Sequence, residues 1–238
     1  MEPVFMILIF VVFATLIIVG AIYSYKQQQA RRLALSQLAA QHGWHFDPSN
    51  DHSHDSRFSQ FSIFTSGKNR YAYNTTRGSL KIAGADWPVQ FGDFHYQTES
   101  NNGKRTTTHT HLLSYVILES PFLGAPDLFI RGEGFFDRIA SAIGFDDIDF
   151  ESSEFSRTFH VQAPRKKWAF DVLHARAIEF LMASPRFHLE FERDAVLAAA
   201  NDRLGPAELE AAIRVAGGLL DALPAWLVRE RTMPGGTV

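Results

Sequence analysis

The feature that most constrains this chain is a run of twenty residues, 4–23, that contains no charged side chain and is rich in Phe, Ile, Leu and Val. In a helix, twenty residues at about 1.5 Å each extend for about 30 Å, which is the hydrocarbon thickness of a bilayer. The run therefore predicts a transmembrane anchor at the N-terminus.

A cleaved signal peptide is the alternative interpretation of this segment. Signal peptides carry a positive residue before a shorter apolar run and a small-residue cleavage site after it. Residues 1–3 contain no basic side chain, and Val-Gly-Ala at 19–21 is only a weak cleavage site. We therefore expect the segment to remain as an anchor.

Basic residues beside the run predict its orientation. Lys26, Arg31 and Arg32 follow the run, and no Lys or Arg precedes it. Because Lys and Arg near the ends of a span favour the cytoplasmic side, the sequence predicts a single-pass protein of the cell inner membrane. Its N-terminus is expected outside and its C-terminal domain in the cytoplasm.

The rest of the chain has the composition of a globular domain. Aromatic residues make up 13% of the sequence and charged residues 21%, which differs from the polar composition of a disordered tail. The formal net charge of −3 gives no basic surface for nucleic acid. The absence of Cys excludes disulfides, thiol nucleophiles and thiolate metal sites, and it agrees with a cytoplasmic location.

Changes in composition and turn signals divide the chain into segments. Gly43 is expected to end the helix that continues from the anchor, and the polar residues after it are typical of a loop. The predicted segments are an anchor at 1–23, a juxtamembrane helix at 24–42, a linker or loop at 43–56, a soluble α+β domain at 57–232 with an internal boundary near 132–145, and a flexible tail at 233–238.

The soluble domain is predicted to begin with an antiparallel β-meander and to continue with mixed helices and strands. Short aromatic and β-branched runs predict strands at 58–65, 71–74, 80–83, 89–98, 106–118, 128–131, 156–161 and 187–191, the last pairing near 195–198. Apolar residues at helical spacing predict helices at 135–143, at 166–182 and from Pro206 to a stop near Pro224.

A hairpin around Asn102 and Gly103 has a register that the sequence itself tests. A two-residue turn there pairs positions whose numbers sum to 205. One face then carries Phe94, Tyr96, Leu113, Tyr115 and Ile117, and the other carries Asp93, His95, Gln97, Thr108, Thr110 and Ser114. Since a slip of one residue would mix these sets, we expect the first face to meet the core, with a longer loop as the alternative.

His109 and His111 are the first pair of candidate metal ligands. They alternate along a predicted strand, so both imidazoles point to one side, where they could chelate Zn²⁺. A metal site needs a third ligand, but the predicted register places His95 on the opposite face and aromatic residues across from the pair. We therefore interpret both as half-buried histidines that pack on aromatic rings.

Other clusters of polar residues have ordinary interpretations as well. His52 and His54 lie between acidic residues in a polar segment and are interpreted as part of a solvated linker. The acidic residues of 146–154 lack the spacing of a calcium loop. The basic residues 165–167 open a helix and are interpreted as solvated, although they could touch anionic lipid or a partner.

Fourteen residues at 148–161 carry a resemblance to a known family. With Trp168-Ala169, the helix at 173–181 and Gly43-Trp44-His45-Phe46, they resemble a family of uncharacterised bacterial single-pass membrane proteins. The resemblance implies an N-terminal anchor, a basic juxtamembrane helix and a globular domain of unknown function. It implies no activity and no site residues, and the basic residues before Trp168 depart from the more acidic turn expected there.

The sequence contains no phosphate loop, nucleophile elbow, zinc-protease helix, kinase signature or dinucleotide fingerprint. We therefore predict a non-enzymatic domain that binds another protein at the inner membrane. Its partners are the lipid bilayer and a protein that the sequence does not identify, and no catalytic residue, cofactor or metal is assigned. The alternative is a membrane-tethered, metal-dependent hydrolase that uses His109 and His111.

Overall fold

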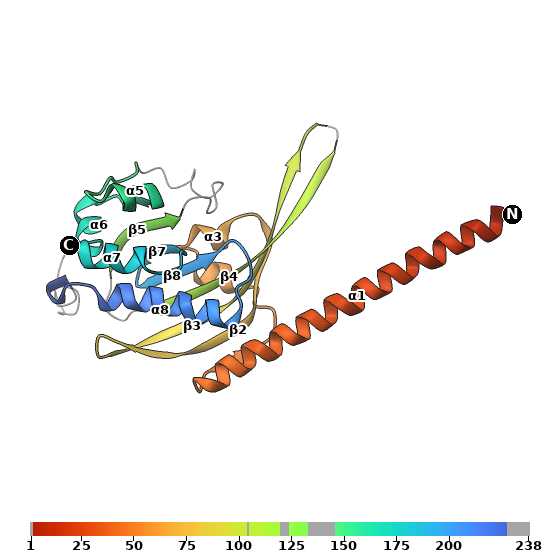
Figure 1. The fold of residues 1–238 in the computed structure, drawn as a ribbon, viewed down its shortest axis with the longest axis horizontal. Helices are drawn as coiled ribbons and strands as arrows, with labels where there is room; N and C mark the ends of the chain where they lie inside the picture. The colour runs from red at the N-terminus through yellow and green to blue at the C-terminus, as the bar shows by residue number, and fades with distance from the viewer. Residues whose placement is uncertain (1, 104, 120–123, 133–145, 228–238) are drawn as a thin grey trace.

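The structure is a computed structural model that describes residues 2–103, 105–119, 124–132 and 146–227. One long helix, α1 (Glu2–Gln41), leads into an antiparallel sheet with the strand order β1-β2-β3-β4-β8-β7-β5-β6 (Figure 1). The strands are β1 (His45–Asp47), β2 (Lys68–Ile82), β3 (Ala85–Asn101), β4 (Thr106–Glu119), β5 (Ala125–Gly132), β6 (Phe159–Gln162), β7 (His188–Arg193) and β8 (Ala195–Ala200). The predicted α+β class, with an apolar N-terminal helix, is confirmed.

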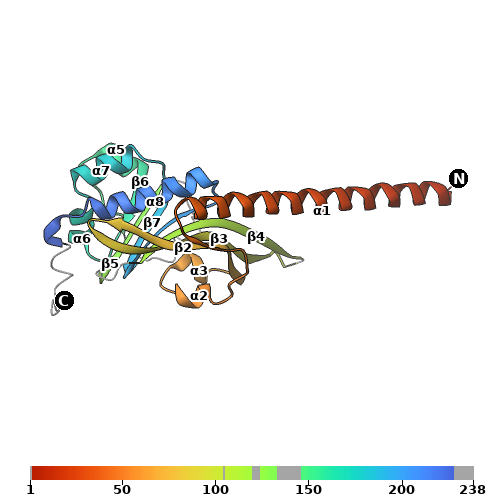
Figure 2. The ribbon, with the colours of Figure 1, turned by 90° about the horizontal axis from the view of Figure 1, so that it is seen from below.

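Helices cover both faces of the sheet (Figure 2). The C-terminal part of α1 lies on one face together with α8 (Pro206–Asp221), α7 (Ala175–Met182) and α5 (Ser153–Thr158). The short helices α2 (His54–Arg57) and α3 (Ser62–Thr65) lie on the other face. Helix α6 (Lys166–Val172) lies directly before α7 in the chain.

Each face of the sheet has its own hydrophobic core. The larger cluster includes Leu35 of α1, Phe91 of β3 and Leu219 of α8, all of which are fully buried. The smaller cluster lies beneath α2 and α3 and includes Phe64 and Tyr115. The sheet is therefore a middle layer with apolar side chains on both faces, as expected for an antiparallel sheet with helices on each side.

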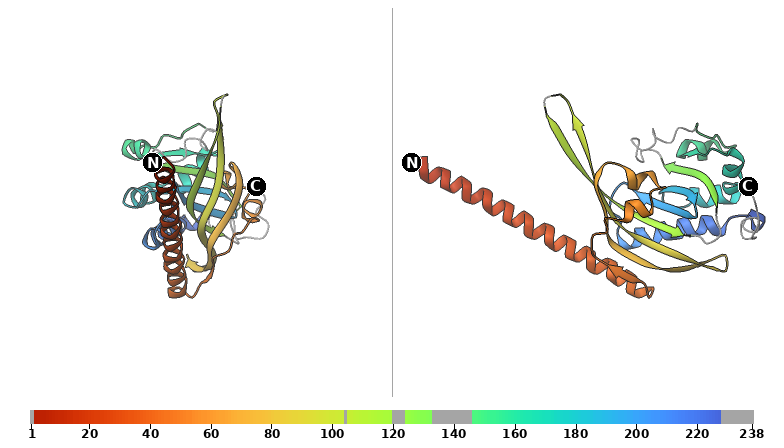
Figure 3. Two further views of the ribbon diagram at one scale, coloured as in Figure 1. Left: turned by 90° about the vertical axis from the view of Figure 1, so that its right-hand side faces the viewer. Right: turned by 180° about the vertical axis from the view of Figure 1, so that it is seen from behind.

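The first half of α1 extends away from the domain (Figure 3). Its large apolar side chains are exposed, with Met6 at 68% and Phe10 at 71%. The most apolar window of the helix has none of its residues buried, and its length and composition suffice to cross a membrane. In contrast, Leu35 and Leu38 in the last two turns are buried against the domain.

A buried ion pair fixes α1 to the sheet. The guanidinium of Arg31 donates to both carboxylate oxygens of Asp93 on β3, from Nε at 2.7 Å and from Nη2 at 2.5 Å. The same carboxylate, which is fully buried, accepts hydrogen bonds from the Asn74 amide and the Ser114 hydroxyl, each at 2.9 Å. Arg31 also donates to the carbonyl of Leu204 at 2.9 Å. With a further hydrogen bond from Arg31 to the Ser114 hydroxyl of β4 at 3.1 Å, the helix is bonded directly to two strands and to the loop before α8.

The β3–β4 hairpin has the predicted faces but a different turn. Its strand pairs sum to 207, as in Asn101↔Thr106, so four residues and not two form the loop. A shift of two residues preserves the alternation of a strand, so the predicted apolar face still meets the smaller core. On the opposite face, Asp93 and Ser114 are buried, because α1 covers them.

The structure corrects three expectations for the segments from residue 43 to residue 83. Residues 58–65, predicted as a strand, instead form α3 and the turn before it, because Phe58, Phe61 and Phe64 recur every three residues and so share one side. The predicted linker at 43–56 contains β1 and the start of α2. The two strands predicted at 71–74 and 80–83 are parts of one strand, β2. The register of its pairing with β3 shifts at two places.

Two predictions for the second half are also corrected. At 156–161 a helix, α5, precedes the strand, since Ser152 accepts a hydrogen bond from the Phe155 amide at 3.2 Å and caps it. The single helix predicted at 166–182 is broken into α6 and α7 at His174, whose ring caps α7. The predicted helix at 135–143, the boundary near 132–145 and the tail at 233–238 lie outside the described residues.

The Arg31–Asp93 pair gives a test of what holds α1 to the domain. The variant Asp93→Asn leaves a largely buried guanidinium without its counter-charge, so we expect a loss of about 3 kcal/mol in the free energy of unfolding. Urea unfolding of the detergent-solubilised chain, followed by tryptophan fluorescence, measures it. The matched control is Asp86→Asn, at an exposed position of the same strand, which should change the free energy by less than about 0.5 kcal/mol.

Candidate functional site

The histidine pair on β4 does not lie beside a third metal ligand in the described part of the chain. His109 is exposed, while His111 stacks on Tyr96 with ring centroids 4.6 Å apart, and its Nε2 lies 2.8 Å from the Thr98 hydroxyl. His95 lies on the other face of the sheet, where it stacks on Tyr71. No group of three or more His, Asp or Glu residues suited to a metal occurs among the described residues. The hydrolase alternative gains no support from this region.

The residues across from His109 and His111 differ from those that pairs summing to 205 would place there. Because the strand pairs sum to 207, Tyr96 lies across from His111 and Thr98 lies across from His109. The interpretation of a half-buried histidine packed on an aromatic ring therefore describes His111, whereas His109 is in solvent.

His54 is buried, which overturns its interpretation as part of a solvated linker. The side chain has no exposed surface and is surrounded by the rings of Phe58, Phe64, Phe94 and Tyr115, with centroids 4.5 to 5.9 Å away. His52 is exposed, with its ring 5.3 Å from that of Tyr71. The phenylalanines that follow His54 recur every three residues. This spacing was the sequence signal for short helices that cover this part of the sheet.

Hydrogen bonds determine which nitrogen of His54 carries the proton. Arg77 donates to the carbonyl oxygen of the Gln90 side chain at 3.0 Å, so the Gln90 amide nitrogen faces His54 and Tyr115, each at 3.2 Å. Nδ1 of His54 must therefore accept, and the proton is on Nε2, which has no hydrogen-bond partner among the described residues. Burial lowers the pKa of His54 to about 3 and raises that of Tyr115 to about 12, so both are neutral at pH 7.

A group of ionisable residues, two of them buried, lies on β5 and β7. His188 and Glu190 are both buried, and Nε2 of His188 lies 3.1 Å from a carboxylate oxygen of Glu190. Burial, together with the negative charges of Glu190 and Asp127, raises the pKa of Glu192 to about 8. This group was not predicted from the sequence, although the alternation of His188, Glu190 and Glu192 places them on one face of the strand.

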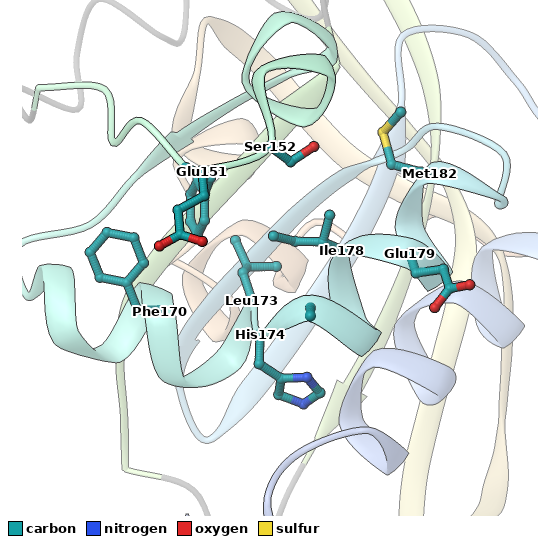
Figure 4. Close-up of a pocket in the computed structure, with 10 residues that line it drawn as sticks. Glu151, Ser152, Phe170, Leu173, His174, Ile178, Glu179 and Met182 are labelled. Atoms are coloured by element: carbon teal, nitrogen blue, oxygen red, sulfur yellow. The ribbon is translucent and has the colours of Figure 1, made fainter.

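A cleft is bounded by α6, α7 and the residues before α5 (Figure 4). Its volume of about 560 Å³ is within the range of small-ligand pockets. Its lining is mainly apolar, and two carboxylates, those of Glu151 and Glu179, lie at its borders. The apolar lining residues are Phe150, Phe170, Leu173, Ala175, Ile178 and Met182, and Ser152 and His174 complete the set.

His174 gives this cleft its shape. Its Nδ1 accepts from the Ala177 amide at 3.4 Å and caps α7, and its Nε2 donates to the Ala222 carbonyl at the end of α8, at 2.9 Å. These two bonds connect the start of α7 to the end of α8 through the His174 ring. The ring of Phe170 on α6 remains 46% exposed beside the cleft. An apolar surface with an acidic border favours a ligand that combines an apolar group with a positive charge.

Comparison with known proteins identifies a fold relative. No family model matches the sequence, and no curated protein matches it. The structure is similar to the crystal structure of the mycobacterial trehalose monomycolate transport factor A, TtfA, with a TM-score of 0.58 and 12% sequence identity. The similarity covers 81% of this chain and 96% of that chain. At this identity the likeness shows a shared fold, and the resemblance to an uncharacterised family remains an expectation.

The lowered pKa of His54 predicts how the free energy of unfolding depends on pH. Its pKa is about 3 in the folded state and about 6.5 when unfolded, so the unfolded chain binds the proton first and stability falls as the pH drops below about 6.5. Between pH 7 and pH 5 this residue should remove about 2 kcal/mol from the free energy of unfolding. We expect that pH-dependent part to disappear in His54→Phe.

Urea unfolding at the two pH values measures this difference. The same substitution at the exposed His109 serves as the control, and His109→Phe should retain the pH dependence of the wild type. If His54→Phe and the wild type lost stability in parallel, the buried imidazole would not be the group responsible.

Proposed function

We propose that this protein is a single-pass protein of the cell inner membrane, with its N-terminus outside and its domain in the cytoplasm, where the domain binds another protein without catalysing a reaction. The observation that carries the proposal is the division of α1. Its apolar half is exposed along its length, and its other half is held in the domain by Arg31. A soluble protein would not expose this much apolar surface.

The charges around α1 support the proposed orientation. Lys26 and Arg32 follow the apolar half, and no Lys or Arg precedes it. Arg31, the third basic residue of this region, pairs with Asp93 and therefore acts within the domain. Arg31 stays on the domain side of the proposed span when it pairs with Asp93. Folding therefore does not change the excess of basic residues on that side.

The cleft beside α6 and α7 supports the binding role. Its apolar lining and its border carboxylates, Glu151 and Glu179, fit a protein segment that presents an apolar side chain next to a Lys or Arg. Helices α6 and α7, which border the cleft, lie at the end of the domain remote from the N-terminus of α1 (Figure 1). A partner would therefore approach from the cytoplasm and not from the bilayer. The name of the fold relative TtfA, a transport factor, is compatible with such a non-enzymatic role.

Reporter fusions test the orientation. A fluorescent protein fused after residue 40 should fluoresce in a bacterial host, and alkaline phosphatase fused at the same position should be inactive, since it is active only after export. As a control, both reporters fused to a variant with three Lys residues inserted after Met1 should show a weaker asymmetry. Active phosphatase in the unaltered chain would contradict the cytoplasmic placement of the domain.

Photo-crosslinking in native membranes tests the cleft. A photoreactive amino acid in place of Phe170 should capture one reproducible protein neighbour, because this side chain is exposed beside the cleft. The same probe at Arg214, which is exposed on α8 outside the cleft, is the matched control. Ile178→Glu adds a charge to the apolar lining and should reduce capture at least fivefold. No reproducible neighbour, or capture that Ile178→Glu leaves unchanged, would contradict the proposed binding site.

A further inference from the structure

The β3–β4 hairpin extends beyond the sheet as a two-stranded ribbon. The two strands remain paired as far as Asn101↔Thr106, whereas the pairing of β2 with β3 ends at Gln97 and the pairing of β4 with β8 ends at Ser114. An isolated two-stranded ribbon has little stability of its own in water. A ribbon of this length is therefore expected to have a contact outside the domain.

The ribbon projects from the domain on the side toward which α1 runs (Figures 1 and 3). The Arg31–Asp93 ion pair is the common origin of both elements. From Asp93 to Asn101 the strand extends for about 26 Å, at about 3.3 Å per residue. From Arg31 back to Tyr25 the helix extends for only about 9 Å, at about 1.5 Å per residue. Even a strongly inclined ribbon therefore reaches the level at which the apolar half of α1 begins.

The composition of the ribbon fits the polar layer of a bilayer and not its interior. Residues 98–110 contain no aliphatic or aromatic side chain other than the ring of His109. The carboxylate of Glu99 is offset by Lys68 at 2.5 Å. Arg105 is exposed and has no acidic partner among the described residues, and the exposed hydroxyls of Thr106, Thr107 and Thr108 lie next to it along the chain.

We infer that the tip of the β3–β4 hairpin lies in the headgroup layer of the bilayer that α1 crosses. There the guanidinium of Arg105 and the threonine hydroxyls donate hydrogen bonds to lipid phosphates. The inference rests on the proposed membrane span of α1 and adds a second contact between domain and bilayer. With two contacts instead of one, the domain has a defined direction relative to the membrane plane.

Single-cysteine labelling tests this inference, because the natural chain contains no Cys. Three variants of the full chain each receive a fluorophore: Thr107→Cys at the hairpin tip, Ala83→Cys in the turn before β3, at the opposite end of that strand from the tip, and Gln28→Cys on α1 beside the apolar half. They are reconstituted in vesicles of phosphatidylcholine and phosphatidylglycerol that contain a nickel-chelating lipid, which quenches fluorophores near the headgroups.

We expect the label at position 107 to be quenched at least threefold more than the label at position 83, and to a degree similar to that at position 28. Equal, weak quenching at 107 and 83 would overturn the inference, and strong quenching at 28 in the same experiment would show that the anchor is nevertheless inserted. Weak quenching at all three positions would overturn both the span and the hairpin contact.

The role of Arg105 has its own readout. Adding Arg105→Gln to the Thr107→Cys variant should reduce the quenching at position 107 at least twofold, because the tip loses the guanidinium that is proposed to bind lipid phosphates. Arg214→Gln, which removes an exposed arginine on α8, is the matched control and should leave the quenching unchanged. Quenching that is insensitive to Arg105→Gln would contradict the proposed phosphate contact.

Discussion

The arrangement of this protein depends on the buried ion pair between Arg31 and Asp93. Apolar side chains such as Leu35 are buried where α1 meets the domain, but hydrophobic contact is non-directional and by itself tolerates sliding and rotation. The Asp93 carboxylate does not, because it is fully buried and accepts from Arg31, Asn74 and Ser114. A shift of α1 by one turn would leave this charge without its counter-charge, at a cost of several kcal/mol. A few polar atoms therefore fix where the apolar half of α1 leaves the domain.

From that fixed point the remaining features extend in opposite directions. The hairpin tip and the apolar half of α1 lie on one side of the domain, and the cleft between α6 and α7 lies on the other (Figure 1). Between them the sheet carries apolar clusters on both faces, and the buried His54 and Tyr115 are neutral at pH 7. The interior thus acts as a structural spacer, and the surfaces suited to contacts are at its ends.

Alternation and helical spacing allowed much of this fold to be predicted from sequence. The faces of β3 and β4 were correct although the turn was wrong, because a slip of two residues preserves alternation. Features that depend on distant residues were not predictable: Arg31 and Asp93 are 62 positions apart, and nothing in either neighbourhood indicates the other. His54 looked solvated because its sequence neighbours are polar, whereas its burial comes from tertiary packing under α2 and α3. The cleft was missed because the helix was predicted to continue through His174.

The continuity of α1 has a mechanical consequence. No Pro or loop interrupts the helix between its exposed half and the turns that pack on the sheet. With the exposed half in a bilayer, as proposed, the helix would act as a lever with one arm in the membrane and one in the domain. A helix that is long for its membrane tilts, and the tilt changes with bilayer thickness. In a thinner bilayer the sheet would turn together with the helix, and the angle at which the cleft faces its surroundings would change with it. Lipid composition would then determine the orientation of the domain relative to the membrane without any change in its fold.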